Sequence, residues 1–271
     1  MHGLGNDYIY FDCMHEDIAE PEKLSVRLSD RHFGIGGDGI ILLCPSKKAD
    51  FKMRMFNADG SEGKMCGNGI RCLAKLAHDL GYVKGDSCSA ETLSGIKKLR
   101  LFFDSKNKVN CVCVDMGAPI LSGREIPSVF SGDKIVGQPL TVDGAEYRVT
   151  LVNMGNPHCV VFCDPDKIDI EKLGPKFENN PAFPDRVNTE FVCVTGRNKL
   201  KMRVWERGSG ETQACGTGAC AAAVASVLNG YSDKNGEITV TLPGGELKIE
   251  YAGTVHMTGP ATFVFAGDIE I

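Results

Sequence analysis

Alternating apolar and polar residues mark six stretches of the chain as β-strands with one buried face. These stretches are Phe51–Asn57, Lys98–Phe103, Val109–Val114, Lys201–Glu206, Glu246–Tyr251 and Thr262–Ala266. Two other stretches have helical spacing: Asn68–Leu80 has one apolar face, whereas Thr217–Leu228 is apolar on nearly every side and should be buried. Gly81 and Gly230 follow these helices, as C-terminal glycines do. The pattern predicts an α+β protein.

The two halves of the chain repeat the same short motifs in the same order. The Cys-Gly-x-Gly that begins at Cys66 returns at Cys215, an offset of 215 − 66 = 149 residues. The same offset relates two Met-Arg-x-aromatic segments and two Thr-Leu-x-Gly segments, and an offset of 150 relates two Gly-Asn pairs. These begin at Met53 and Met202, Thr92 and Thr241, and Gly5 and Gly155. Coincidence is the alternative in a chain with 32 glycines, but ordered matches at almost one offset favour a duplication.

A duplication predicts two domains, residues 1–116 and residues 117–271, with a turn-rich junction near Gly117. We expect each domain to be a curved, mostly antiparallel sheet around its central helix. Related halves commonly pack about a pseudo-two-fold axis. That arrangement would place the two Cys-Gly-x-Gly motifs in a cleft between the domains.

Composition narrows the possible partners. Apolar residues make up 42% of the chain, enough for a real core, and the net charge of −5 argues against a nucleic-acid partner. The longest apolar runs, near Ile40–Cys44 and Ala219–Leu228, are shorter than the roughly 18 residues that span a bilayer. The first residues are too polar for a signal peptide. We therefore expect no membrane association and a cytoplasmic location.

Two familiar site types fit this sequence poorly. The chain has 12 cysteines but no Cys-x-x-Cys pair, so a structural zinc or iron–sulfur site is disfavoured and we predict no metal. Residues 34–39 match Gly-x-Gly-x-x-Gly, but the strand-like stretch Ile40–Cys44 follows where a dinucleotide site needs a helix. The neighbouring Arg31 and Asp38 are interpreted as loop or structural residues.

Cys66 and Cys215 stand apart from the other cysteines because each directly precedes a predicted helix. Free N–H groups and the helix dipole at such a position should lower a thiol pKa, and the Gly-x-Gly that follows leaves room for a bound carboxylate. Two thiols on opposite faces of one carbon suit racemisation: one removes the Cα proton and the other returns a proton to the opposite face. This chemistry requires no cofactor.

At these motifs the sequence resembles the diaminopimelate epimerase family, over essentially the whole chain. The matching segments start at His2, Phe56, Cys66, Gly155, Arg186, Glu206 and Ala214. Proline racemase-like enzymes share the two cysteines, but Asn68 in the first motif and Glu206 well before Cys215 favour the diaminopimelate branch.

The resemblance implies interconversion of LL- and meso-2,6-diaminopimelate, on the route to lysine and peptidoglycan, by a homodimer. It implies Cys66 and Cys215 as the acid–base pair, with His158 and Glu206 tuning the thiols. The implied substrate contacts are Asn6, Asn57, Gly67, Asn68, Asn156, Asn188, Glu206, Arg207, Gly216 and Thr217. The chain departs from the family at Gly39, where many members have a substrate-contacting Gln, and at Phe265, where many have a Tyr linked to dimer packing.

Two other functions remain open from the residues alone. The protein is then either a racemase that uses the same two thiols on another amino acid, or a thiol-rich binding or redox protein without catalysis. Loss of turnover on replacing either cysteine would separate catalysis from the last of these.

Overall fold

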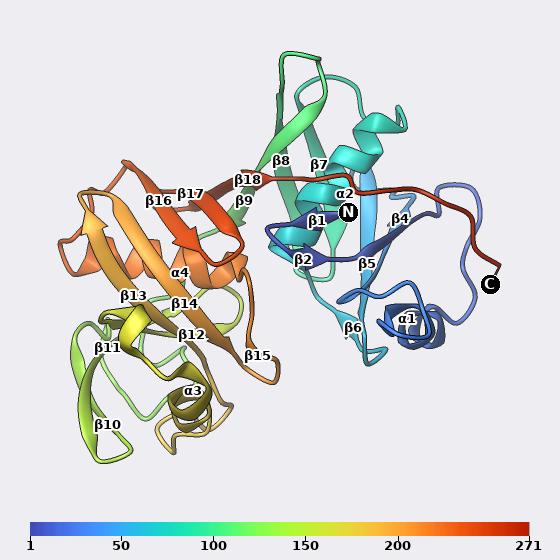
Figure 1. The fold of residues 1–271 in the computed structure, drawn as a ribbon. Coiled ribbons are helices and arrows are strands. Elements are labelled where there is room, and N and C mark those ends of the chain that lie inside the picture. The colour runs from blue at the N-terminus through green and yellow to red at the C-terminus, as the bar shows by residue number, and fades with distance from the viewer. Residues whose placement is uncertain (271) are drawn as a thin grey trace. The chain divides into compact units, whose positions relative to one another are not determined.

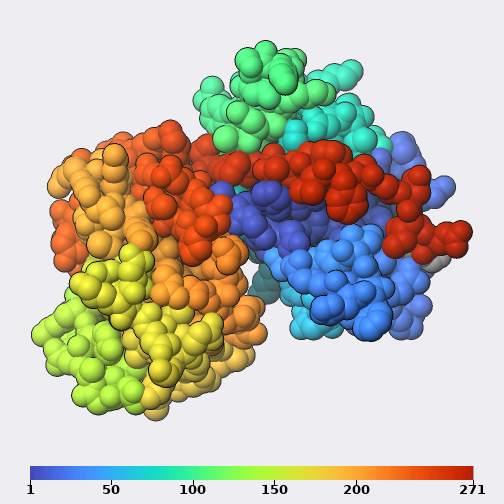
Figure 2. Space-filling model, viewed as in Figure 1, coloured from blue at the N-terminus to red at the C-terminus, as the bar shows by residue number. Residues whose placement is uncertain are grey.

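The computed structural model describes residues 1–270 and divides the chain into two compact units (Figure 1). The first contains Met1–Asp115 together with the C-terminal segment from Thr258, and the second contains Met116–Met257. The sequence assigned that C-terminal segment to the second half. In the structure His2 and Thr262 exchange backbone hydrogen bonds, and the segment lies across the surface of the first unit (Figure 2).

The first unit is an α+β domain built on one mixed sheet. In this sheet β3 pairs in parallel with β4, β4 antiparallel with β5, β5 in parallel with β7, and β7, β8 and β9 antiparallel in turn. Helix α2 packs against β4, β5, β7 and β8, while α1 covers β4 and β5. The elements are β1 (His2–Gly3), β2 (Asn6–Asp7), β3 (Ile9–Asp12), α1 (Pro21–Ser29), β4 (Gly39–Cys44), β5 (Phe51–Asn57), β6 (Glu62–Gly63), α2 (Gly67–Asp79), β7 (Ser87–Thr92), β8 (Gly95–Phe103) and β9 (Val109–Gly117).

The second unit repeats this topology. Strand β12 pairs in parallel with β13, β13 antiparallel with β14, β14 in parallel with β16, and β16 antiparallel with β17; β10 and β11 extend the sheet beyond β12. The elements are β10 (Gln138–Val142), β11 (Ala145–Asn153), β12 (Pro157–Phe162), the 3₁₀ turn η1 (Pro165–Lys167), α3 (Ile170–Glu178), β13 (Asn188–Gly196), β14 (Lys199–Glu206), β15 (Gly210–Glu211), α4 (Gly216–Leu228), β16 (Glu237–Leu242), β17 (Gly245–Tyr251) and β18 (Val255–Pro260).

Element by element, the series β3-α1-β4-β5-β6-α2-β7-β8 corresponds to β12-α3-β13-β14-β15-α4-β16-β17. Each pair of neighbouring strands in this series has the same direction, parallel or antiparallel, as the corresponding pair in the other unit. The predicted α+β fold with two related domains is therefore confirmed at the level of chain topology.

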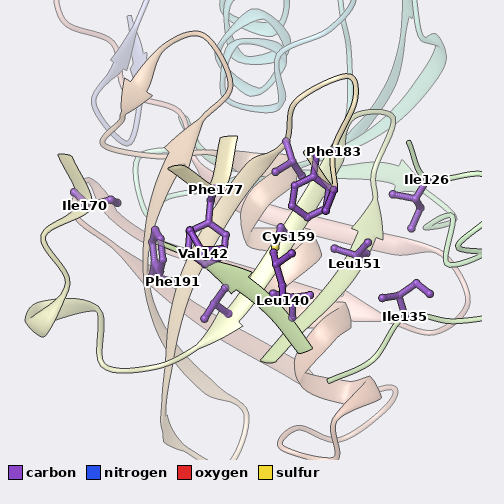
Figure 3. Packing of buried hydrophobic residues seen from close by; sticks show 14 residues of the cluster. Ile126, Ile135, Leu140, Val142, Leu151, Cys159, Ile170, Phe177, Phe183 and Phe191 are labelled. Carbon is purple, nitrogen blue, oxygen red and sulfur yellow. The ribbon is translucent and has the colours of Figure 1, made fainter. Parts of the chain in front are cut away.

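The apolar faces predicted for the two helices are buried, except for Leu80 at the end of the first, which is exposed. Ala219–Ala225 of α4 is fully buried, as expected for a helix that is apolar all round. A second core of the same unit lies on the other side of its sheet, under α3 (Figure 3). There Phe177 and Phe191 meet edge to face, with ring centroids 5.5 Å apart.

One predicted strand is wrong. In the segment Thr262–Ala266 only Thr262 forms a β-bridge, to His2, and the chain then leaves the sheet. Phe263, Val264 and Phe265 are more than half exposed. The alternation thus did not lead to a strand here, since β1 spans only two residues and pairs with this segment at Thr262 alone.

Gly39 has a backbone that excludes any side chain. It lies at φ +152°, and a Cβ there would come within 2.0 Å of the backbone oxygen of Phe56 on the neighbouring strand. We expect Gly39→Ala to lower the free energy of unfolding by about 2–4 kcal/mol, measured by urea denaturation. Gly196→Ala is the control, because a Cβ at Gly196 meets only Lys199 at an ordinary 3.8 Å. Equal denaturation midpoints for the two variants would contradict this.

Candidate active site

Cys66 is the N-cap residue of α2, as its position before the predicted helix suggested. Its Sγ accepts a hydrogen bond from the Gly69 N–H at 3.3 Å and donates one to Asn6 Oδ1 at 3.3 Å. Gly67 and Asn68 form the first turn of the helix, where backbone N–H groups point away from the helix body. The first unit thus brings three predicted site residues, Cys66, Gly67 and Asn68, close to Asn6.

The orientation of Asn6 is set by a charged network that the sequence interpretation treated as structural. The Asn6 Nδ2 donates to Asp38 Oδ2 at 2.7 Å, which leaves Oδ1 toward the thiol. Arg31 binds both Asp7 and Asp38, at 2.7 and 3.1 Å. Burial, together with the charge of Asp7, raises the pKa of Asp38. Asp38 therefore orients Asn6, although it lies in the Gly-x-Gly-x-x-Gly segment, residues 34–39, for which the sequence suggested no binding role.

Asn57 lies at the end of β5, in the turn toward β6. Its Nδ2 donates to Ser61 Oγ at 3.0 Å, and its backbone N–H donates to the Ser61 carbonyl. The structure therefore gives Asn57 a turn-forming role, which is what asparagine does most often.

Cys215 occupies the equivalent position in the second unit. As N-cap of α4, its Sγ accepts from the Gly218 N–H at 3.4 Å and lies 3.5 Å from Thr217 Oγ1. Gly216 and Thr217 form the first turn of the helix. Both predicted catalytic thiols thus have the same local geometry, each receiving an N–H from the third residue after it.

The expected low thiol pKa is wrong for Cys215. Burial raises the pKa of this thiol well above its usual range, and the negative charges of Glu206 and Glu190 raise it further. The hydrogen bonds from Thr217 and Gly218 act in the opposite direction but are smaller effects. A helix N-terminus alone would favour the thiolate, but desolvation and two nearby carboxyl groups outweigh it.

His158 lies at the centre of a buried polar chain in the second unit. Its Nδ1 is 2.7 Å from Glu190 Oε1, and its Nε2 is 3.0 Å from Asn156 Oδ1. Neighbouring parallel strands β12 and β13 place His158 opposite Asn188, so that Glu190, two residues further on, points to the same face. Glu190 was missed by the sequence reasoning. An acidic residue inside the apolar stretch from Asn188 to Val194 was its only signal, since a buried charge requires a partner.

The turn after β14 holds Glu206 and Arg207 in place. Asn188 Oδ1 accepts from the Arg207 backbone N–H at 3.0 Å, and its Nδ2 donates to the Pro157 carbonyl at 2.8 Å. Thr212 donates its hydroxyl to Glu206 Oε1. The Arg207 guanidinium binds the Asp185 carbonyl at 2.8 Å. Asn188 therefore braces this turn through both ends of its amide.

Comparison with known proteins finds relatives along almost the whole chain. The family model for diaminopimelate epimerase matches residues 1–122 and 150–264. The chain is 52% identical to the diaminopimelate epimerase of Acetivibrio thermocellus, over 100% of this chain and 97% of the relative. It is 51% identical to that of Agathobacter rectalis, over 100% and 98%.

Solved structures of lower identity share the fold. A hydroxyproline epimerase from Agrobacterium vitis superposes with a TM-score of 0.63 at 13% identity, over 96% of this chain and 86% of that one. A phenazine biosynthesis protein of the PhzF family from Bacillus anthracis gives a TM-score of 0.62 at 15% identity, over 93% and 89%. With its full-length relatives and its family match, this chain belongs to the diaminopimelate epimerase family, which consists of isomerases.

Proposed function

We propose that the protein interconverts LL- and meso-2,6-diaminopimelate by moving the Cα proton between Cys66 and Cys215, without a cofactor. The observation that carries the proposal is the repeated geometry of the two thiols, each an N-cap with a backbone N–H donated to its sulfur. Family membership supports the substrate, because the relatives at about half identity are diaminopimelate epimerases.

In each turnover one thiolate removes the Cα proton and becomes a thiol. The opposite thiol delivers its proton to the other face of the carbon and becomes a thiolate, so one proton leaves and one arrives. The carbanion is stabilised by delocalisation into the α-carboxylate, on which negative charge grows. Backbone N–H groups of Gly67 and Asn68, and of Gly216 and Thr217, are placed at helix N-termini suited to that charge.

The raised pKa of Cys215 fits this scheme in one respect. A raised pKa favours the protonated thiol, which is the form of Cys215 that donates a proton to the substrate carbon. Glu206, which raises the thiol pKa by its charge, and His158 then adjust the proton affinity of this site.

Polar side chains are available for the remaining groups of the substrate. A guanidinium such as that of Arg207 binds a distal carboxylate with two parallel hydrogen bonds. Amides such as Asn6 and Asn156 accept from an ammonium group and donate to a carboxylate. The family resemblance adds Asn57, Asn188 and Glu206 to the proposed substrate contacts. Asn57 and Asn188 would reach the substrate only by exchanging the hydrogen bonds that they make within the protein.

Incubation with LL-diaminopimelate in D2O tests the function. We expect deuterium at the inverted Cα of the meso product, followed by mass spectrometry and NMR. Proline and hydroxyproline are the comparison substrates, because a solved structure of similar fold is named a hydroxyproline epimerase. Exchange with one of these and none with diaminopimelate would assign the same chemistry to another amino acid. The absence of exchange with any of them would refute the isomerase function.

We further propose that the protein is a homodimer that works in the cytoplasm and supplies lysine and peptidoglycan precursors. The exposed side chains of Phe263, Val264 and Phe265 support self-association, since contiguous apolar surface usually marks an interface. Light scattering after gel filtration measures the mass directly.

A reducing compartment such as the cytoplasm suits the two thiols, because the mechanism needs both of them unoxidised. Among residues 1–270, none of the helices has the length and apolar character of a membrane span.

A further inference from the structure

The buried pair of His158 and Glu190 is unusually isolated from solvent. Both side chains have zero exposure, and their contact of 2.7 Å joins Nδ1 to Oε1. The other carboxyl oxygen, Oε2, has no hydrogen-bond partner among the described residues. An ionised carboxyl group with a single partner costs several kcal/mol to bury, so the pair is poorly explained by stability.

The same carboxyl group lies beside the second cysteine site. A Cβ on Gly218 would be 2.8 Å from Glu190 Oε1 and 3.2 Å from Cys215 Sγ. Gly218 is also the residue whose N–H donates to that sulfur. Gly218 thus adjoins both the Glu190 carboxyl group and the Cys215 thiol. The charge of Glu190 raises the pKa of that thiol.

The two nitrogens of the His158 ring have hydrogen-bond partners of different kinds. At Nδ1 the partner is the Glu190 carboxyl group, which can only accept when it is ionised and then favours the tautomer with the proton on Nδ1. At Nε2 the partner is the Asn156 amide, which offers an acceptor or, after rotation, a donor. Nε2 is therefore the ring nitrogen whose hydrogen bond can change without breaking the contact with Glu190.

We propose that Glu190 is a positioning residue that holds His158 with its proton on Nδ1 and its Nε2 toward Asn156, so that Nε2 is the exchangeable proton site of the ring. The inference rests on the proposed function, in which His158 tunes the thiol chemistry. Glu190 touches neither substrate nor reacting carbon in this scheme and acts on the reaction through the His158 ring.

Glu190→Gln is the principal test, because it keeps the shape of the side chain and removes the charge. The amide of Gln offers an N–H to the ring, which moves the proton from Nδ1 to Nε2. We expect kcat for diaminopimelate epimerisation to fall about 10- to 100-fold, with KM changed by less than about threefold. The 15N chemical shifts of the His158 imidazole, measured without substrate, should change from the Nδ1-protonated to the Nε2-protonated pattern.

Two further variants separate positioning from folding. Glu190→Asp keeps the charge on a shorter side chain, and should retain the Nδ1-protonated pattern and more activity than Glu190→Gln. Thr189→Val, an isosteric change at the adjacent buried position of β13, is the matched control and should leave kcat and the His158 shifts unchanged. If Glu190→Gln does not fold, the shifts in Glu190→Asp decide: an Nε2-protonated pattern there overturns the proposal.

A double-variant cycle tests whether Glu190 acts through His158. In a His158→Gln protein, the further change Glu190→Gln should cost less than about threefold in kcat, because the effects of residues acting as a unit do not multiply. Multiplying losses, or unchanged 15N shifts in Glu190→Gln, would overturn the proposal. If the native protein does not exchange the Cα proton of diaminopimelate, the proposed function fails, whereas the imidazole shifts still decide the role of Glu190.

Discussion

Replacement of either Cys66 or Cys215 by alanine is expected to lower diaminopimelate epimerisation by about 10²- to 10⁴-fold, the usual contribution of a general acid or base. Inversion needs a proton taken from one face and a proton given to the other, so neither thiol substitutes for its partner. The variants Cys66→Ser and Cys215→Ser should recover little of the lost epimerisation rate, since a hydroxyl ionises far less readily than a thiol. Coupled turnover assays in both directions measure the effect.

The residual chemistry of the two variants should differ. Each retains one thiol on one face of the substrate, and so should exchange the Cα proton of only one stereoisomer in D2O, without inversion. The two variants should favour opposite stereoisomers. Matched controls are Cys72→Ala and Cys220→Ala, which remove a buried sulfur from the same two helices. Undiminished epimerisation in Cys66→Ala or Cys215→Ala would refute the two-thiol mechanism.

Replacement of Gly218 by alanine is expected to lower kcat about 10²-fold, the loss that follows a misplacement of about 1 Å at a reacting group. The added methyl group would lie 2.8 Å from Glu190 Oε1 and 3.2 Å from Cys215 Sγ, so it pushes the carboxyl group and the thiol apart. The helix preference of alanine over glycine, about 1 kcal/mol, should offset part of the stability that this close contact costs. Steady-state kinetics and thermal unfolding measure the two effects separately.

Gly69 is the control that the duplication provides. A Cβ at Gly69 would meet the Cδ1 methyl of Ile41 at 2.4 Å and come no closer than 3.4 Å to the Cys66 side chain. Gly69→Ala should therefore overpack the core, at a cost of about 1–3 kcal/mol, with a smaller loss of kcat than Gly218→Ala. Equal kinetic losses in the two variants would contradict the role given to the Glu190 carboxyl group.

The local features of the site were predictable from the sequence. Helices predicted over 68–80 and 217–228 begin and end within a residue of α2 and α4, and both cysteines are N-caps. Such features depend on neighbours a few residues apart, which the spacing of apolar residues and glycines encodes directly. The repeat of short motifs likewise predicted the repeated strand topology, because duplicated sequence folds by the same local rules.

Tertiary structure alone decided the partners of the site residues. The pairing of His158 with Glu190 depends on the parallel register of β12 and β13, and the contact of Asn6 with Asp38 joins segments 32 residues apart. It also decided the direction in which the pKa of Cys215 shifts, since the helix start lowers that pKa but burial and nearby carboxyl groups raise it more. Periodicity within a segment shows which face is buried. It does not show which distant residue meets that face, because pairing and desolvation arise only when separate elements come together.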